Sequence, residues 1–138
     1  MSRKPWEEID DCEMITFKAG IAAGAKMVMT AHISLPNVTG SNTPSTLSSM
    51  ILQDKLRGEL GYKGVIVSDA MEMGAIIRQY PVEDACIMAI KAGVDILLCV
   101  REYPRVFETV VNAVRRGEIP ESRIDESVRR ILALRQKD

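Results

Sequence analysis

The sequence predicts an α/β fold in which parallel strands alternate with helices. Three short apolar runs, each typical of a buried strand, occupy residues 26–32, 64–69 and 95–100. Helical patterns separate these runs, and strands that alternate with helices form parallel sheets whose strands are buried on both faces. A closed (β/α)8 barrel needs eight strands and about 250 residues. A chain of 138 residues with three strands is therefore expected to form a partial TIM-like barrel.

The first half of the chain is predicted as helix, strand, loop and helix. Residues 6–19 carry helix-forming residues and end at glycines ahead of the first strand. Residues 33–48 are rich in Pro, Gly, Ser, Thr and Asn, which predicts a surface loop after that strand. The segment that follows places Leu52, Leu56 and Leu60 on one helical stripe.

The second half of the chain repeats this pattern. A helix from Val82 to about Lys91 is expected to end at Gly93, ahead of the third strand. Two further helices are predicted because apolar residues recur at steps of three and four positions. These residues are Phe107, Val110, Val111 and Val114 in one helix, and Ile124, Val128, Ile131 and Leu132 in the other. We expect a single domain over residues 1–138.

Composition limits the class of protein and its partners. Hydrophobic residues make up 46% of the chain and charged residues 27%, as is typical of a soluble globular domain. The formal net charge is −1 and no basic run is interleaved with aromatic residues, which argues against a nucleic-acid partner. No apolar run approaches the ~20 residues that cross a bilayer, and residues 1–10 lack the apolar core of a signal peptide. We therefore expect a cytoplasmic protein with no membrane partner.

The cysteines and the single histidine indicate no metal site. Cys12, Cys86 and Cys99 are widely spaced and are predicted to be reduced, mostly buried thiols. His32 is the only histidine, and the chain has no CxxC or HxxxH pattern. We expect neither a bound metal nor a cofactor.

One carboxylate stands out because of its place on a strand. The stretch GVIVSDAMEMG, residues 64–74, puts Asp69 at the carboxyl end of the second strand, ahead of a turn into helix. Ligands and chemistry collect at the carboxyl ends of parallel strands. Side chains alternate along a strand, which predicts Val65, Val67 and Asp69 on one face. Capping of the following helix is the alternative role for this side chain.

Four stretches of the chain follow one another in an informative order: MVMTAHISLPNV, PSTLS, LRGELGYKGVIVSDAMEMGAI and AIKAGVDILL. In order and spacing they resemble glycoside hydrolase family 3, in particular its β-N-acetylglucosaminidase branch. The resemblance spans about residues 6 to 134. The sister β-glucosidase branch typically has an aromatic residue after the nucleophilic aspartate, where this chain has Ala70.

The resemblance implies a TIM-like barrel and retaining hydrolysis of terminal β-linked N-acetylhexosamine through a covalent glycosyl-enzyme intermediate. It makes Asp69 the nucleophile, at the end of what would be the seventh barrel strand. The acid/base of this branch is a histidine in a Gly-His-Gly loop that the sequence lacks, so His32 does not inherit that role. His32 is expected to be a hydrogen-bonded structural residue or to line the sugar pocket, and Met73 to pack or to form the pocket wall. Glu72 is expected at a helix start, because retaining enzymes need carboxylates on opposite sides of the bond.

The resemblance thus predicts a carbohydrate-binding segment that is not competent for hydrolysis by itself. Unpaired edges of the strands at 26–32 and 95–100 predict a homo-oligomer or a complementing N-terminal barrel segment. A non-catalytic scaffold, or a truncated gene product, is the first alternative. A receiver-like phospho-acceptor domain is the second, since VIVSDAMEM also resembles a phospho-acceptor strand end. The first predicted strand of this chain, however, ends in Ala31 and His32, where a receiver has an acidic pair that binds magnesium.

Overall fold

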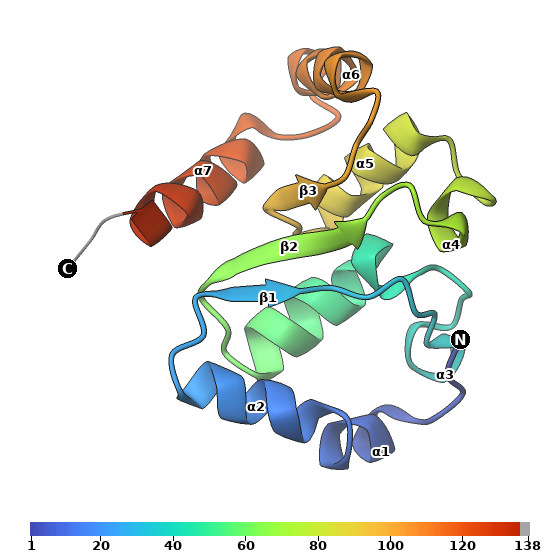
Figure 1. The fold of residues 1–138 in the computed structure, drawn as a ribbon, viewed down its shortest axis with the longest axis vertical. Coiled ribbons are helices and arrows are strands. Elements are labelled where there is room, and N and C mark those ends of the chain that lie inside the picture. The colour runs from blue at the N-terminus through green and yellow to red at the C-terminus, as the bar shows by residue number, and fades with distance from the viewer. Residues whose placement is uncertain (136–138) are drawn as a thin grey trace.

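The computed structural model describes residues 1–135, which form a parallel three-stranded sheet with helices between the strands. The strands are β1 (Met27–Met29), β2 (Val65–Ala70) and β3 (Ile96–Leu98). Their order is β1-β2-β3, so β2 is the middle strand (Figure 1). The predicted α/β class and parallel sheet are confirmed. Strands β1 and β3 are shorter than the predicted runs, because the ladder ends before His32 and before Val100.

The sheet is regular on one side of β2 and irregular on the other. Met27 to Met29 pair with Val65 to Val67 one for one. On the β3 side, Val67 pairs with Ile96 but Ala70 pairs with Leu98, so β2 has one residue more than β3 between these two pairs. Such a bulge bends a strand and re-aims the side chains near it. The strict alternation assumed for Asp69 therefore does not hold along the whole of β2.

The helix predicted at 6–19 is two helices, α1 (Trp6–Asp11) and α2 (Met14–Ala22). Cys12 separates them with φ −126° and ψ −75°, which lie outside the helical region. The chain then turns at Gly24, whose φ of 86° suits glycine, and enters β1.

The prediction of a surface loop at 33–48 is wrong for its second half. The segment contains α3 (Pro36–Thr39) and a short 3-10 helix, η1 (Ser45–Leu47), whose residues are all buried. Hydroxyl groups in this part of the chain bond inside the protein, as when Ser45 Oγ donates to the Ile33 carbonyl at 2.7 Å. Buried polar residues are tolerated when they are hydrogen-bonded in this way. Composition alone therefore indicated exposure wrongly.

The helices between the strands follow the predicted pattern. They are η2 (Met50–Glu59), which has the wider π-helical hydrogen bonding, then α4 (Gly74–Ile77) and α5 (Val82–Ala92). Leu52 and Leu56 are buried as predicted, and α5 ends at Gly93 as predicted.

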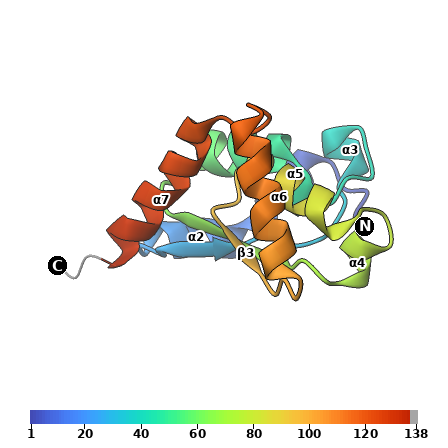
Figure 2. The ribbon, with the colours of Figure 1, turned by 90° about the horizontal axis from the view of Figure 1, so that it is seen from above.

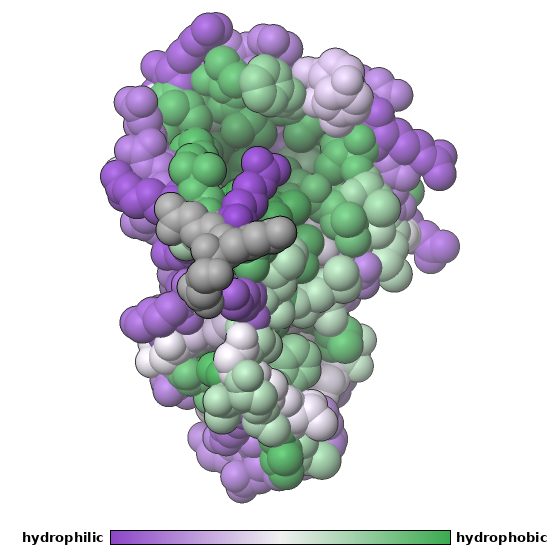
Figure 3. Space-filling view, turned by 60° about the vertical axis from the view of Figure 1, so that its left-hand side comes forward, coloured by the Kyte–Doolittle hydropathy of each residue, from purple (hydrophilic) through white to green (hydrophobic). Residues whose placement is uncertain are grey.

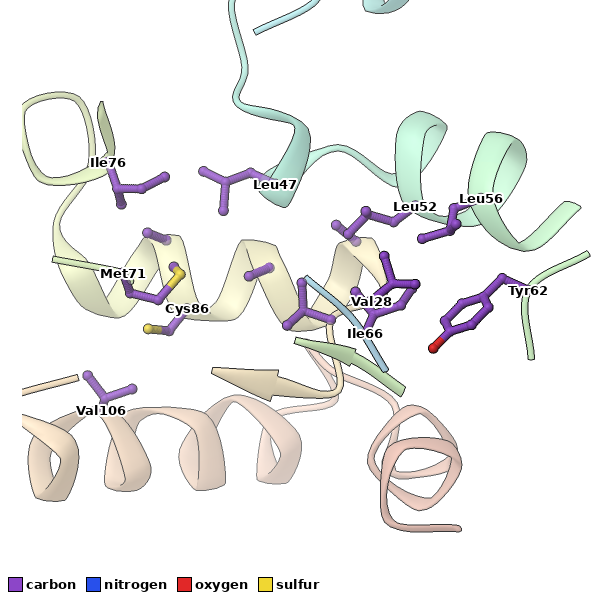
Figure 4. Packing of buried hydrophobic residues seen from close by; sticks show 14 residues of the cluster. Val28, Leu47, Leu52, Leu56, Tyr62, Ile66, Met71, Ile76, Cys86 and Val106 are labelled. Atoms are coloured by element: carbon purple, nitrogen blue, oxygen red, sulfur yellow. The ribbon is translucent and has the colours of Figure 1, made fainter. Parts of the chain in front are cut away.

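The main core lies between the sheet and these helices. Leu52 and Leu56 of η2 lie close to Val28 and Ile66 of the strands (Figure 4). At the other end of the same cluster, Met71, Ile76, Cys86 and Val106 come together (Figure 4). This packing fixes the carboxyl end of β2, because Met71 follows directly after that strand and is fully buried.

The last two helices, α6 (Tyr103–Arg115) and α7 (Glu121–Arg135), pack differently from their predicted stripes. In α6, Val106 is buried and Phe107 is exposed, so the inward face is turned by one residue from the prediction. In α7, the apolar residues Val128 and Leu132 are exposed, whereas Ser127 is buried. The face of α7 that meets the rest of the protein is therefore mixed: Ser127 lies on it, together with Ile124, which packs against a second apolar cluster of Ile87, Ala113 and Ile119.

A buried carboxylate explains why polar side chains of α7 face the rest of the protein. The side chain of Asp95, at the start of β3, has no exposed surface. Its oxygens lie 2.8 Å from Arg57, 3.0 Å from Arg130 and 3.5 Å from Arg123, and it accepts hydrogen bonds from Ser127 Oγ and the Ile66 amide. Burial is the main reason that the pKa values of Arg57 and Arg123 are lowered. We call these residues the Asp95 cluster: Arg57, Asp95, Arg123, Ser127 and Arg130.

Apolar surface remains open beside the sheet. Met27 and Met29 on the edge strand β1 are 43% and 50% exposed. An apolar cavity of about 270 Å³ lies next to β1, and its lining includes Phe17 of α2 and Met29. Apolar side chains also cover much of the face seen in Figure 3, where the upper half is hollowed. The predicted exposure of strand edges is thus present for β1.

The exposure of the thiols differs from the prediction. Cys86 is buried, but Cys12 and Cys99 are exposed, so the prediction of mostly buried thiols is wrong. Within residues 1–135, no helix is long and apolar enough to cross a membrane.

Candidate active site

The carboxyl ends of β1 and β2 lie at one end of the molecule. Figures 1 and 2 both show α3 and α4, which follow these two strands, at that end, and α7 at the opposite end. Asp69 is the second-last residue of β2 and is partly exposed there. The structure therefore places Asp69 where the sequence predicted it, at the carboxyl end of the middle strand.

One oxygen of the Asp69 carboxylate is held and the other is free of protein partners. Oδ1 accepts a hydrogen bond from the backbone amide of the next residue, Ala70, at 2.7 Å. Among the residues that the structure describes, no group donates to Oδ2. The side chain does not cap α4, whose N-cap residue is Met73. This arrangement leaves one oxygen of a fixed carboxylate available for chemistry.

His32 lies beside this strand end, but both of its ring nitrogens are occupied. Nε2 lies 2.9 Å from the carbonyl oxygen of Ala70, and Nδ1 lies 2.8 Å from Oγ1 of Thr46. Of the two roles expected for His32, the structure favours the hydrogen-bonded structural one. Thr46 was not singled out from the sequence, because its segment was interpreted as a surface loop. A buried threonine in a polar run gives no local signal of its partner.

Glu72 is not placed at a helix start as predicted. Its Oε2 lies 2.7 Å from Nε of Arg101, and its other oxygen accepts the Arg101 backbone amide. Glu72 thus joins the segment after β2 to the segment after β3. A carboxylate engaged in this way is a poor proton donor, which agrees with the sequence-based exclusion of Glu72 as the acid.

Met73 is exposed next to Glu72, and its side chain lines neither of the two main cavities. Asp69 and His32 do not line these cavities either. The larger, open one lies at the opposite, amino-terminal ends of β1 and β2, where Lys26 and Val65 line it. The three predicted site residues therefore share one rim, which lies outside both of these cavities.

Within residues 1–135, no group of three or more His, Cys, Asp or Glu side chains is close enough together to hold an ion. The functional groups gathered at the rim are one carboxylate with a free oxygen, one histidine and one ion pair. A carboxylate at the carboxyl end of a parallel strand is typical of an α/β enzyme domain with a TIM-like arrangement.

The family of the chain follows from comparison with known proteins. Residues 1–134 match the family model described as "Glycosyl hydrolase family 3 N terminal domain". The chain therefore belongs to glycosyl hydrolase family 3, and the family resemblance of the sequence motifs is confirmed. This membership replaces the receiver-like interpretation.

Named relatives agree with this assignment. A "Beta-N-acetylglucosaminidase/beta-glucosidase" from Cellulomonas fimi is 35% identical in an alignment 138 positions long. The alignment covers 94% of this chain and 24% of the relative. The solved structure of a family 3 β-N-acetylglucosaminidase from Paenibacillus sp. str. FPU-7 has a TM-score of 0.92 and 42% identity, over 98% of this chain and 26% of that one. The β-N-acetylglucosaminidase from Thermotoga maritima has a TM-score of 0.90 and 29% identity, over 99% of this chain and 32% of that one.

The chain spans only part of each of these relatives, between 24% and 32% of their length. The similarity to their structures confirms that the three strands and their helices are arranged as part of the family's TIM-like barrel domain. The activity of a complete family member is a property of more residues than this chain contains.

Proposed function

We propose that this chain supplies the nucleophile side of a retaining β-N-acetylhexosaminidase site, with Asp69 as the nucleophile. The observation that carries the proposal is the position of Asp69 at the carboxyl end of the middle strand, with Oδ1 held and Oδ2 free. The names of the relatives support N-acetylhexosamine as the sugar.

The proposed reaction has two steps, as in other retaining glycosidases. In the first, Oδ2 of Asp69 attacks the anomeric carbon, and the bond from that carbon to the leaving-group oxygen breaks. The leaving oxygen takes a proton from a general acid. In the second, water attacks the same carbon, releases the sugar and restores the carboxylate, while the conjugate base of that acid accepts the proton of the water. The end of β2 holds the carboxylate in a fixed orientation toward the anomeric carbon.

In the described part of the chain, neither Glu72 nor His32 is free to act as the proton donor. Glu72 is paired with Arg101, and both ring nitrogens of His32 are bound within the protein. Turnover of an ordinary N-acetylglucosaminide by the chain alone should therefore be negligible. A dinitrophenyl glycoside needs little protonation of its leaving group, so it isolates the nucleophilic step.

A proton donor and a strand partner for β1 would both come from a complementing segment that carries the first five strands of the barrel. Edge strand β1 has no strand partner on its outer side in residues 1–135, and Met27 and Met29 on it are exposed. The cavity of about 270 Å³ next to β1 is lined mainly by apolar side chains, as a packed strand and helix require. We take this segment as the occupant, because the matched part of the solved Paenibacillus enzyme is 26% of a longer chain.

The test measures dinitrophenol release by the chain, alone and mixed with the matching first-five-strand segment of the Paenibacillus enzyme. We expect release from the mixture, loss of that release in Asp69→Asn, and unchanged release in Asp54→Asn, an exposed aspartate of η2. Mass spectrometry should find the sugar attached to Asp69. Release that survives Asp69→Asn refutes the nucleophile assignment, and a mixture that forms a complex without release favours the non-catalytic scaffold.

A further inference from the structure

The backbone around Asp69 is held by side chains where the sheet ladder is interrupted. The bulge in β2 lies between Val67 and Ala70. Asp69 therefore lies in the stretch where the regular pairing of β2 with β3 is interrupted. Within the bulge, Ser68 Oγ accepts the amide of Leu98 at 2.9 Å, and the backbone ladder resumes where the Met71 amide donates to the Leu98 carbonyl at 3.0 Å. On the β3 side, a buried hydroxyl therefore substitutes for a ladder hydrogen bond.

On the β1 side, the corresponding bond comes from His32. A carbonyl oxygen only accepts hydrogen bonds, so the contact of 2.9 Å between Nε2 of His32 and the Ala70 carbonyl requires the proton on Nε2. In the neutral ring, Nδ1 is then an acceptor, and Oγ1 of Thr46 donates to it at 2.8 Å. Thr30 Oγ1, at 2.8 Å from Thr46 Oγ1, can donate in turn.

These contacts form a directed chain of hydrogen bonds from Thr30 through Thr46 and His32 to Ala70. Thr46 is fully buried and Thr30 is 8% exposed, so both hydroxyls are shielded from water that could replace their partners. Two other acceptors lie near Thr46 Oγ1, the Thr30 hydroxyl at 2.8 Å and the Ala31 carbonyl at the longer distance of 3.2 Å. The orientation of the imidazole is therefore fixed by buried groups on the side away from Ala70.

Ala70 is the link between His32 and the carboxylate. Its carbonyl accepts from His32, and its amide donates to Oδ1 of Asp69 at 2.7 Å. We propose that His32 is a positioning residue, which as the neutral Nε2-protonated tautomer clamps Ala70 and thereby fixes the Asp69 carboxylate, and that it does not bind the sugar. The positioning role rests on the proposed function of Asp69, whereas the clamp itself does not.

The clamp is tested first without any sugar. Because His32 is the only histidine in the chain, nitrogen labelling of histidine gives a single imidazole in the nuclear magnetic resonance spectrum of the 138-residue protein. We expect the Nε2-protonated tautomer, and faster amide exchange at Ala70 and Met71 in Thr46→Val than in Thr46→Ser. An Nδ1-protonated ring, or equal exchange in the two variants, overturns the clamp.

The positioning role is tested by the rate at which a fluorinated dinitrophenyl N-acetylglucosaminide labels Asp69 in the complemented protein. His32→Ala should lower the limiting labelling rate about 100-fold, the typical effect of a misplacement of about 1 Å, with little change in the half-saturating concentration. His32→Gln retains an amide donor near the position of Nε2 and should recover most of that loss. If the half-saturating concentration rises while the limiting rate is kept, His32 binds the sugar and the proposal is wrong.

Folding and function are separated by two comparisons. Thermal unfolding of His32→Gln and His32→Ala should be similar, and equal loss of labelling in both variants would refute positioning by a donor at Nε2. If the unaltered protein is not labelled at Asp69 although its imidazole has the expected tautomer, the proposed function fails and the positioning role with it, while the clamp stands on the exchange measurement.

Discussion

Replacing Asp95 by asparagine removes the only carboxylate that the three arginines of the Asp95 cluster share. Asparagine has nearly the same shape, so the change removes charge and leaves little cavity. Its amide group places a donor toward guanidinium donors. Arg57, at 2.8 Å, loses its counter-charge, and Arg130, at 3.0 Å, keeps the more exposed Glu126 at 3.5 Å. Breaking a buried pair by removing one partner typically costs about 3–5 kcal/mol.

That loss is large compared with the stability of a domain, which is typically about 5–15 kcal/mol. With a urea dependence of about 2 kcal/mol per molar, the unfolding midpoint of Asp95→Asn should fall by about 2 M. The assay is urea unfolding followed by circular dichroism. Asp125→Asn is the matched control, because Asp125 is an exposed aspartate of α7 that lies 3.7 Å from Arg129. Asp125→Asn should lower the free energy of unfolding by about 0.5 kcal/mol or less.

Two results would contradict this account of the Asp95 cluster. The first is a midpoint for Asp95→Asn that equals that of Asp125→Asn. The second is a failure of Arg57→Met to recover part of the loss when it is combined with Asp95→Asn, because removal of one guanidinium lowers the uncompensated positive charge.

Two other predictions concern thiols and glycines. Burial raises the pKa of Cys86 from 9.0 to about 12, so native alkylation followed by mass spectrometry should modify Cys12 and Cys99 but spare Cys86. Because the folded pKa is the higher one, the protonated thiol stabilises the fold below pH 9, and this contribution should be lost as the pH rises from 9.0 to about 12. A Cβ at Gly64 would lie 2.7 Å from a backbone carbonyl oxygen, whereas one at Gly20 meets no atom within 4 Å. Gly64→Ala should destabilise by about 1–3 kcal/mol and Gly20→Ala stabilise by about 0.5–1 kcal/mol in urea unfolding; equal midpoints would contradict this.

The parts of the fold that were predictable are those with a local signal. Apolar runs gave the centres of the strands, the stripe of Leu52 and Leu56 gave the inward face of η2, and Gly93 gave the end of α5. These features depend on residues within one or two turns of each other. The position of Asp69 at the end of β2 belongs to this group, because it is a property of one strand.

The parts that were not predictable depend on residues far apart in the chain. The bulge beside Asp69 is a property of the pairing between β2 and β3 and has no pattern within either strand. The partners of Asp95 come from positions 57, 123, 127 and 130, so Ser127 of α7 is buried while the predicted stripe residues Val128 and Leu132 are exposed. The contact between His32 and Thr46 joins residues 14 apart, and Thr46 lies in a segment that composition had indicated as exposed. The cytoplasmic location inferred from the sequence stays a prediction.

The dispersal of the Asp95 partners has a consequence for how the chain folds during its synthesis. Arg130 lies 35 residues after Asp95, so a ribosome makes the carboxylate long before it makes this guanidinium. Until α7 leaves the exit tunnel, β3 can pair with β2 only if the Asp95 carboxylate is buried without Arg123 and Arg130 beside it. Completion of the sheet should therefore wait for the last helix, and the nascent polypeptide should gain protease resistance late and in a single step.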